Sequence, residues 1–224
     1  MVHLAALLSS GGARVVITTT TKIWPPSYPV VLVENRSGWK EHLAELLQTE
    51  TCVCLANSEA PDGKLKGVEP RLLCDLISSH QADVVVCEAD GAAGRPLKVH
   101  GPNEPVIPPC STLTLVLAGL DAVGQKVSAG AVHRIERAEE ILQTKLTSVI
   151  EPSHVAQAMM AAVERIPTRS RVGFLLNKAD NHERLGHARA IAHMLIQRGA
   201  HGAIIATRYD LERKLVGIHN LTHT

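Results

Sequence analysis

The stretch 83–98 constrains the fold more than any other, and it starts with an uninterrupted apolar run, 84–87. A run without polar alternation is typical of a parallel strand that is covered on both faces. Glu88, Asp90 and Gly91 follow directly. Ligands of open α/β sheets bind beyond the carboxyl ends of the strands, where carboxylates can hold hydrated Mg²⁺ beside a phosphate chain. A strand that ends in an ordinary polar turn is the alternative.

A run of four threonines ends another predicted strand. Residues 14–17 form a short strand that opens directly into Thr18–Thr21 and Lys22. The hydroxyls and the lysine ammonium offer donors at the carboxyl end of that strand, suited to phosphate oxygens or to the water shell of a metal. We therefore assign Thr20, Thr21 and Lys22 to phosphate or metal-water contacts. A β-prone threonine run on a solvated edge is the alternative.

Strands alternate with amphipathic helices along the chain. Helices are predicted over 1–10, 37–48, 69–79, 132–143, 153–163 and 181–198, and strands over 14–17, 30–33, 51–56, 84–87, 113–117, 171–176 and 202–206. This alternation implies right-handed βαβ crossovers and an α/β fold with a mostly parallel sheet flanked by helices. Because no repeat or clear linker interrupts the pattern, a single domain over 1–224 is predicted.

Composition argues against several classes of function. The formal net charge is +1 and aromatic residues make up 2% of the chain, which speaks against a nucleic-acid surface with stacking platforms. No apolar run has the length of a membrane span and no signal peptide is recognisable, so no membrane association is expected and the protein is predicted to be cytoplasmic. The five cysteines lack zinc-site spacing and are expected to be reduced.

A second motif of chemical interest follows a late strand. Asn177, Lys178 and Asp180 form an N-K-x-D sequence between the apolar run 172–176 and a predicted helix. A carboxylate here can accept two N–H donors from the edge of guanine, a donor pair that adenine lacks. The lysine stem can cover the base, and the asparagine can tether neighbouring loops. The pattern predicts purine-nucleotide binding, and a structural turn is the alternative.

Basic residues follow the acidic pair. Gly91 lets backbone N–H groups approach an anion, and Arg95 and Lys98 lie on the loop behind it. Two roles are open for these two cations: neutralising the charge that develops in phosphoryl transfer, or binding an anionic partner cofactor. His133 and Arg134 are predicted to begin a helix, where an anion is favoured, and a surface cap fits equally well.

In combination these motifs resemble the YqeC family. The matching segments are residues 15–23, 88–98, 104–108, 119–124, 132–134 and 176–180. Members of that family are P-loop NTPase-like proteins regarded as accessory factors for selenium-dependent molybdenum hydroxylases. The resemblance implies a three-layer P-loop NTPase-like sandwich, Mg²⁺ and a purine nucleotide (GTP or ATP) as cofactors, and an apo-molybdenum hydroxylase or its cofactor as partner. The selenium role follows from the resemblance alone.

One departure from the family pattern concerns the phosphate loop. The family opens with a strand and a glycine-rich G-x-G-G-K-[ST] loop, whereas this sequence starts inside the following helix and contains no G-x-x-x-x-G-K-[ST]. That loop would supply a backbone cradle, a lysine and one Mg²⁺ ligand. The sandwich is therefore expected to miss its first strand. A misplaced start is the favoured explanation because every later motif is intact, and a degenerate paralogue is the other.

We interpret the sequence as a nucleotide-binding accessory protein for maturation of a selenium-dependent molybdenum hydroxylase. In this interpretation Glu88 and Asp90 position Mg²⁺ or the attacking water, and Lys22 assists catalysis. NTPase activity is expected only with the missing loop, so weak nucleotide binding and little turnover are predicted for these 224 residues. Two alternatives are open: a non-enzymatic scaffold that delivers a cofactor, and a nucleotidyltransferase that acts on a molybdenum cofactor.

Overall fold

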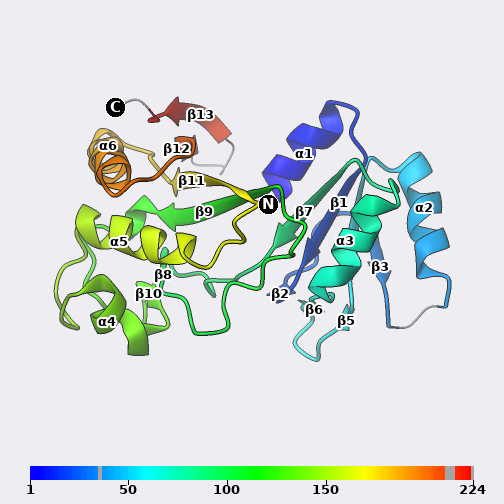
Figure 1. Cartoon of the computed structure of the whole chain (residues 1–224), viewed down its shortest axis with the longest axis horizontal. Coiled ribbons are helices and arrows are strands. Elements are labelled where there is room, and N and C mark those ends of the chain that lie inside the picture. The colour runs from blue at the N-terminus through cyan, green and yellow to red at the C-terminus, as the bar shows by residue number, and fades with distance from the viewer. Residues whose placement is uncertain (35–36, 210–214, 223–224) are drawn as a thin grey trace. The chain divides into compact units, whose positions relative to one another are not determined.

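The computed structural model of the chain describes residues 1–34, 37–209 and 215–222. Its contacts divide the chain into two compact units. Unit 1 comprises residues 1–91 and 106–110, and unit 2 comprises residues 92–105 and 111–224. Figure 1 labels the helices and strands of both. Each unit has its own sheet, so the two are described separately.

Unit 1 is built on a parallel sheet with the strand order β3-β4-β1-β7. The register aligns Val15 of β1 with Cys52 of β4 and with Val84 of β7. Unit 1 also contains a short antiparallel sheet with the strand order β2-β6-β5. The elements of unit 1 are α1 (Val2–Ser10), β1 (Val15–Thr19), β2 (Lys22–Ile23), β3 (Val30–Leu32), α2 (Trp39–Thr49), β4 (Cys52–Ala56), β5 (Ser58–Glu59), β6 (Leu65–Lys66), α3 (Pro70–Ser78) and β7 (Val84–Glu88).

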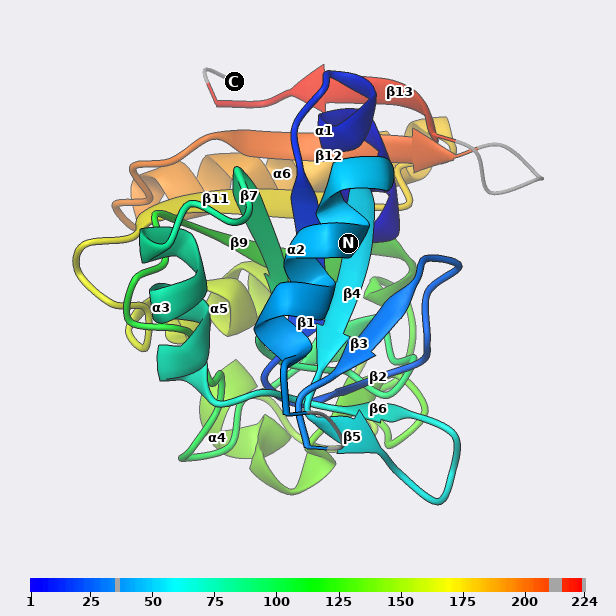
Figure 2. The same ribbon diagram turned by 90° about the vertical axis from the view of Figure 1, so that its right-hand side faces the viewer.

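The core of unit 1 lies on both faces of this sheet. On one face Val16 and Val53 pack with Leu43 of α2 and Leu73 of α3, and Figure 2 shows these two helices in front of the strands. On the opposite face Ile17 belongs to a cluster that includes Ala5 of α1. Because successive side chains of a strand point to opposite faces, the apolar run of β1 can fill both cores at once. Unit 1 is therefore a helix–sheet–helix arrangement of three layers.

Unit 2 contains a second sheet, with the strand order β13-β12-β11-β9. β9, β11 and β12 are parallel, whereas β13 pairs antiparallel with β12. The elements of unit 2 are β8 (Leu97–Lys98), β9 (Leu113–Gly119), η1 (Leu120–Ala122), β10 (Val132–His133), η2 (Ile135–Arg137), α4 (Ala138–Leu142), α5 (Pro152–Val163), β11 (Arg171–Asn177), α6 (His182–Gln197), β12 (Ile204–Tyr209) and β13 (Leu215–Asn220).

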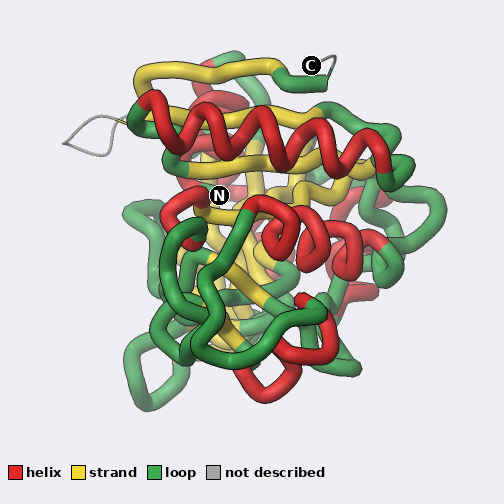
Figure 3. Tube along the Cα trace, turned by 90° about the vertical axis from the view of Figure 1, so that its left-hand side faces the viewer, coloured by secondary structure: helices red, strands yellow, loops and turns green. Residues whose placement is uncertain are grey.

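One face of this second sheet forms the larger core of the protein. Phe174 and Leu176 of β11 pack with Met159 of α5 and Leu195 of α6. Figure 3 shows helices in front of the strands of this sheet. Asn181 accepts a hydrogen bond from the backbone N–H of Arg184 and so caps α6 at its start.

A two-stranded parallel ladder of β8 and β10 completes unit 2. The sequence predicts a helix over 132–143, and this is wrong for its first part. Val132–His133 is a strand, Arg134 is left-handed with φ 65°, and an α-helix begins only at Ala138. The backbone of residues 132–133 pairs with β8 instead of continuing a helix, because long-range pairing overrides local propensity here.

The predicted α/β class, with parallel sheets flanked by helices, is confirmed. The parallel strands are divided among three sheets, β3-β4-β1-β7, β12-β11-β9 and β10-β8. The contacts divide the chain into two compact units, and the single domain over 1–224 stays a prediction. The antiparallel strand β13 is an addition that the sequence pattern did not predict. P-loop identity stays a prediction. Among the described residues, no helix is long and apolar enough to cross a membrane.

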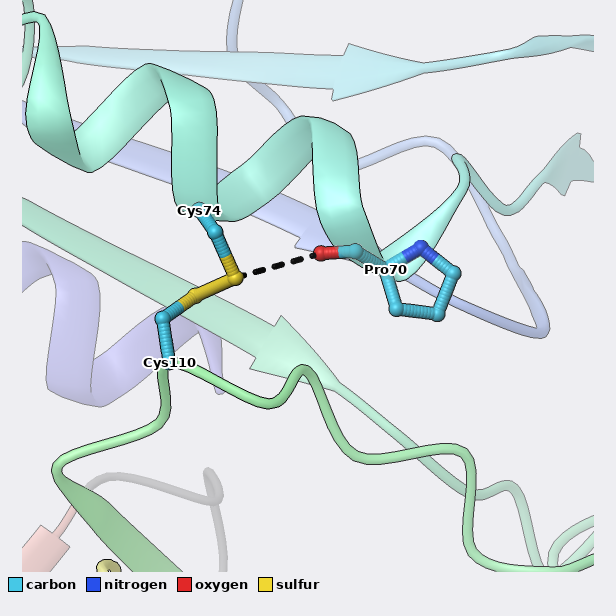
Figure 4. Close-up of a disulfide and its surroundings, with 3 residues drawn as sticks. All are labelled: Pro70, Cys74 and Cys110. Atoms are coloured by element: carbon cyan, nitrogen blue, oxygen red, sulfur yellow. Dashed lines mark hydrogen bonds between the residues drawn. A yellow bond between two sulfur atoms is a disulfide. The ribbon is translucent and has the colours of Figure 1, made fainter.

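The expectation of reduced cysteines is wrong for Cys74 and Cys110. Cys74 on α3 and Cys110 form a disulfide with their Cα atoms 5.4 Å apart, and Figure 4 shows the bond with the Cys74 sulfur 3.7 Å from the carbonyl oxygen of Pro70. The two cysteines are 36 positions apart, so only the folding of segment 106–110 against unit 1 reveals that they are neighbours. Cys52, Cys54 and Cys87 are free thiols.

Candidate functional site

The carboxyl ends of β1 and β7 lie side by side in unit 1. The parallel register pairs Thr19 with Glu88. The hydroxyl of Thr19 donates to the backbone carbonyl of Glu88 at 2.8 Å, and the N–H of Thr20 donates to the same carbonyl at 3.1 Å. The predicted threonine run and the predicted acidic pair are therefore brought together at one edge of one sheet.

The threonine hydroxyls are engaged in hydrogen bonds inside unit 1. Thr18 donates to the carbonyl of Leu55 at 2.8 Å, and Thr20 donates to the carbonyl of Val106 at 2.7 Å. The hydroxyls of Thr19 and Thr21 lie 3.2 Å apart. These bonds commit the hydroxyl protons of Thr18 and Thr20 to the fold, while their oxygens keep acceptor capacity. The predicted contacts of Thr20 and Thr21 with phosphate or metal water stay predictions.

The acidic pair lies in a setting that disfavours two negative charges. Burial raises the pKa of Glu88, the amino-terminal ammonium opposes that rise, and the neighbouring carboxylate of Asp90 adds to it. Gly91 lies beside this carboxyl: a Cβ at Gly91 would be 3.6 Å from Oε1 of Glu88. A cation between two carboxylates would reverse their mutual repulsion, because it favours the charged form of both.

The two carboxylates at this edge suit Mg²⁺ better than a metal that takes all of its ligands from protein side chains. Within the described ranges of the chain, no group of three or more His, Cys, Asp or Glu side chains gathers as a metal centre. Mg²⁺ commonly keeps several waters and takes one or two carboxylates together with substrate phosphates. Glu88 and Asp90 therefore fit Mg²⁺ as a pair of oxygen ligands, with the remaining positions left to water or phosphate.

Backbone groups of two other segments are hydrogen-bonded to this edge; the sequence analysis singled out residues 104–108 without assigning them this contact, and it gave no role to Gly67. The N–H of Gly67 donates to the carbonyl of Thr21 at 2.6 Å, and a Cβ at Gly67 would lie 2.3 Å from the carbonyl carbon of Thr20. On the other side, the N–H of Val106 donates to the carbonyl of Ala89 at 3.0 Å. The proline-rich sequence around Val106 was the feature that could have indicated the contact of Val106 with Ala89. For Gly67 a single sequence offers no such feature.

The Asn177–Asp180 turn in unit 2 is fixed to β12. The side-chain oxygen of Asn177 accepts from the N–H of Lys178 at 3.0 Å and from the hydroxyl of Thr207 at 2.9 Å. One carboxylate oxygen of Asp180 accepts from the N–H of Tyr209 at 3.0 Å, and the other lies 3.4 Å from the guanidinium of Arg184. The asparagine thus tethers a neighbouring segment, as predicted. The aspartate makes similar tethers, which are the bonds a structural turn requires.

Lys178 extends this turn toward η1. Its backbone is left-handed, with φ 66°, and its ammonium lies 2.6 Å from Oδ2 of Asp121. Asp121 belongs to the 119–124 segment that the sequence singled out without assigning a role. The Lys178 side chain is 43% exposed, so it retains surface that could cover a base.

The remaining predicted site residues lie on other elements. Lys22 is exposed on β2 of unit 1. In unit 2, Arg95 donates to the carbonyls of Ala93 at 2.7 Å and Ala129 at 3.1 Å, and the ammonium of Lys98 lies 3.2 Å from Glu104. Arg95 and Lys98 are therefore held by protein groups of unit 2. Their assignment to nucleotide phosphates stays a prediction.

Comparison with known proteins finds similarity to one family. A family model described as YqeC protein matches residues 1–136. The protein named "Uncharacterized protein YqeC" from Escherichia coli (strain K12) is 30% identical over 180 residues, which cover 78% of this chain and 69% of that protein. No solved structure matches. The residues matched by the family model include both the Thr18–Lys22 run and the acidic pair.

Proposed function

This chain belongs to the YqeC family, and on that basis we propose that it binds a purine nucleotide, GTP or ATP, together with Mg²⁺. The observation that carries the proposal is the pairing of Thr19 with Glu88, which gathers hydroxyls and two carboxylates at the carboxyl ends of adjacent parallel strands. Open α/β sheets bind ligands at such strand ends. The proposal makes two assignments, each within one unit.

The first assignment places the metal and phosphate chemistry in unit 1. Glu88 and Asp90 supply oxygen ligands to Mg²⁺, and the metal in turn supplies positive charge for phosphate oxygens. Burial leaves the charged form of Glu88 incompletely solvated, which raises the pKa of its carboxyl. A bound cation would therefore stabilise that charged form. Thr21, whose backbone carbonyl accepts from the N–H of Gly67, supplies a hydroxyl oxygen at the same edge.

The second assignment places base recognition in unit 2. Asp180 accepts N–H donors from guanine, Lys178 covers the base and Asn177 holds the turn against β12. Asp180 has a one-third exposed side chain. Its ion pair with Arg184 spans 3.4 Å at the surface, where such pairs contribute little. A base can therefore compete for this carboxylate at modest cost.

The cellular role we propose is that of an accessory factor in maturation of a selenium-dependent molybdenum hydroxylase. Family resemblance alone supports this role. Since the 224 residues contain no G-x-x-x-x-G-K-[ST] loop, we expect weak nucleotide binding and slow hydrolysis. Binding, not turnover, is therefore the property to measure first.

Titration with fluorescently labelled GTP and ATP, with Mg²⁺ or with a chelator, tests both assignments. Asp180→Asn should weaken GTP binding by roughly tenfold and leave ATP within about twofold, the cost of one charge-assisted hydrogen bond. Asparagine keeps an oxygen for the N–H of Tyr209, so the turn should persist. Glu183→Gln, an exposed acid in the first turn of α6, is the matched control.

Glu88→Gln should abolish the effect of Mg²⁺ on binding, whereas Glu59→Gln, an exposed acid of β5 in the same unit, should not. Equal loss of GTP and ATP on Asp180→Asn would show that the turn is structural. Absence of binding for either nucleotide by the unaltered chain at millimolar concentration would refute the proposal as a whole.

A second candidate, the non-enzymatic scaffold, is favoured by the hydrogen bonds that occupy the Asn177–Asp180 turn. A turn built only to hold β11 and β12 together would make the same bonds. Product analysis separates the candidates: released phosphate indicates a hydrolase, pyrophosphate indicates nucleotidyl transfer, and no product together with tight partner binding indicates a scaffold.

A further inference from the structure

Asp121 carries a buried carboxylate oxygen that nothing in the described part of the chain satisfies. Its Oδ2 lies 2.6 Å from the ammonium of Lys178, whereas its Oδ1 is buried and has no hydrogen-bond partner among the described residues. A buried acceptor without a donor costs free energy, and native structures contain few of them. The position of this carboxylate therefore needs a reason beyond the packing of unit 2.

Two neighbouring strand ends of unit 2 bring Asp121 and Lys178 together. β9 and β11 are parallel neighbours (Figure 1), and their register pairs Gly119 with Asn177, the last residue of each strand. Asp121 comes two residues after Gly119, in η1, and Lys178 directly follows Asn177. The carboxylate and the ammonium therefore meet at the carboxyl edge of this sheet, where the proposed base recognition lies.

The backbone of Asp121 is fixed by its neighbours. Leu120 and Ala122, on either side of it, are buried in the core of unit 2. The backbone carbonyl of Asp121 accepts from Nε2 of Gln125 at 2.6 Å. Because both neighbours are packed and the carbonyl is bonded, the direction in which the Asp121 side chain leaves the chain is set by the fold.

Gly119 leaves room for the carboxylate. A Cβ at Gly119 would lie 2.5 Å from Oδ1 of Asp121 and 3.1 Å from Cβ of Pro96, and the first distance is shorter than real Cβ contacts. The N–H of Gly119 donates to the carbonyl of Pro96 at 2.8 Å, which holds the glycine in place. The carboxylate can therefore occupy its position beside Lys178 only because residue 119 has no side chain.

Lys178 is oriented by its own backbone as well as by Asp121. Its φ is 66°, a left-handed conformation that residues other than glycine adopt rarely and that is enriched at functional sites. A lysine side chain loses much rotamer freedom when it is held against a ligand. Fixing the ammonium on Asp121 before a base arrives removes part of that cost from binding.

We propose that Asp121 is a positioning residue that holds the stem of Lys178 over the purine base by fixing its ammonium. The inference rests on the proposed function and adds to it a residue outside the N-K-x-D sequence. The lysine stem covers the face of the ring, which GTP and ATP share, whereas Asp180 reads the edge, in which they differ. Asp121 therefore raises the affinity for both purines and leaves the choice between them to Asp180.

Titration of the full chain with fluorescently labelled GTP and ATP, at constant ionic strength, provides the test. Asp121→Asn keeps the shape of the side chain and removes its charge. Both nucleotides should bind about threefold to tenfold more weakly, and the ratio of the GTP and ATP affinities should stay within about twofold. Glu164→Gln removes an exposed negative charge elsewhere in unit 2 and should change either affinity by less than about twofold.

The direction of the change separates positioning from simple electrostatics. Loss of a negative charge by itself favours an anionic nucleotide, so weaker binding by Asp121→Asn requires a route through another group. Lys178→Met keeps an apolar stem without the ammonium. In that background Asp121→Asn should cause no further loss, because no ammonium remains to be held.

Gly119→Ala tests the same contact without touching either charged residue, and it takes the place of Asp121→Asn if that variant fails to fold. Its Cβ would displace Oδ1 of Asp121, so it should weaken GTP and ATP to a similar extent. Gly186→Ala on α6, where a new Cβ has nothing within 4 Å, is the matched control and should leave both affinities unchanged.

Three results would overturn the inference alone. Weaker binding of GTP but not of ATP by Asp121→Asn would show that the whole turn moved with Asp180. An equal loss in the Lys178→Met background would show that Asp121 acts through another group. Unchanged affinities in Asp121→Asn, with normal binding by the unaltered chain, would leave the proposed function standing. Failure of the unaltered chain to bind either nucleotide would instead refute the proposed function and this inference together.

Discussion

The Cys74–Cys110 disulfide gives the sharpest quantitative prediction. Cys74 lies on α3, and Cys110 ends segment 106–110, whose Val106 bonds to Ala89 and Thr20 at the candidate site. The bond closes a loop with a sequence separation of 36. For such a loop the chain-entropy relation gives about 4 kcal/mol of stabilisation of the folded state. Removing the bond should therefore destabilise unit 1 and loosen segment 106–110.

Urea unfolding followed by tryptophan fluorescence measures this in unit 1 alone. Both tryptophans of the chain, Trp24 and Trp39, belong to unit 1. With a urea slope of about 1.5 kcal/mol per molar, the midpoint should fall by roughly 2.5 M in Cys74→Ser/Cys110→Ser. A dithiol reductant should lower the midpoint of the unaltered chain equally and leave the double variant unchanged, which controls for effects on the free thiols.

Thiol counting under denaturing conditions checks the premise. Three of the five cysteines should react before reduction, Cys52, Cys54 and Cys87, and all five after it. Five reactive thiols in the unreduced protein would show that Cys74 and Cys110 do not form a disulfide. Three reactive thiols with an unchanged urea midpoint would refute the reasoning from loop closure.

Three further predictions concern single residues. Gly67→Ala should destabilise unit 1 by about 3 kcal/mol or more, because the new Cβ would lie 2.3 Å from the carbonyl carbon of Thr20 and the backbone would have to move. Urea unfolding followed by tryptophan fluorescence measures this change in stability. A destabilisation below about 1 kcal/mol would contradict the clash. Gly186→Ala should stabilise α6 by about 1 kcal/mol, because alanine has the higher helix propensity and its Cβ would have no atom within 4 Å. Urea unfolding followed by circular dichroism should show a higher midpoint. A lower midpoint would show that the new methyl group clashes with its surroundings. Pairing with Arg134 holds the pKa of Glu104 to about 2 in the fold, below its ordinary 4.5, so its contribution to stability is complete above about pH 4.5 and is lost as the pH falls towards 2. Glu104→Gln should show less of this acid destabilisation by circular dichroism, and an unchanged pH profile would argue against the Arg134–Glu104 pair.

Local patterns determined the strands that carry the candidate site. The apolar residues 15–17 belong to β1 and are buried, as expected for a strand that fills the core on both faces of a parallel sheet. The run 84–87 is a strand as predicted, but it is only partly buried because β7 is the last strand in the order of its sheet. The sequence placed the threonine run and Glu88 at the carboxyl ends of two parallel strands, and only the register shows that these two strands are neighbours. The Asn177–Asp180 turn was located in the same way, at the end of β11.

Contacts between distant segments decided the rest. The hydrogen bonds of Gly67 and Val106, the Cys74–Cys110 bond and the pairing of Lys98 with His133 join residues far apart in the chain. A helix over 132–143 was a sound expectation from local propensity, yet pairing with β8 outweighed it. Sequence by itself therefore determined that the long apolar runs are strands and where their polar ends lie. Tertiary structure alone decided which polar groups meet, because those contacts depend on chain topology and not on local pattern.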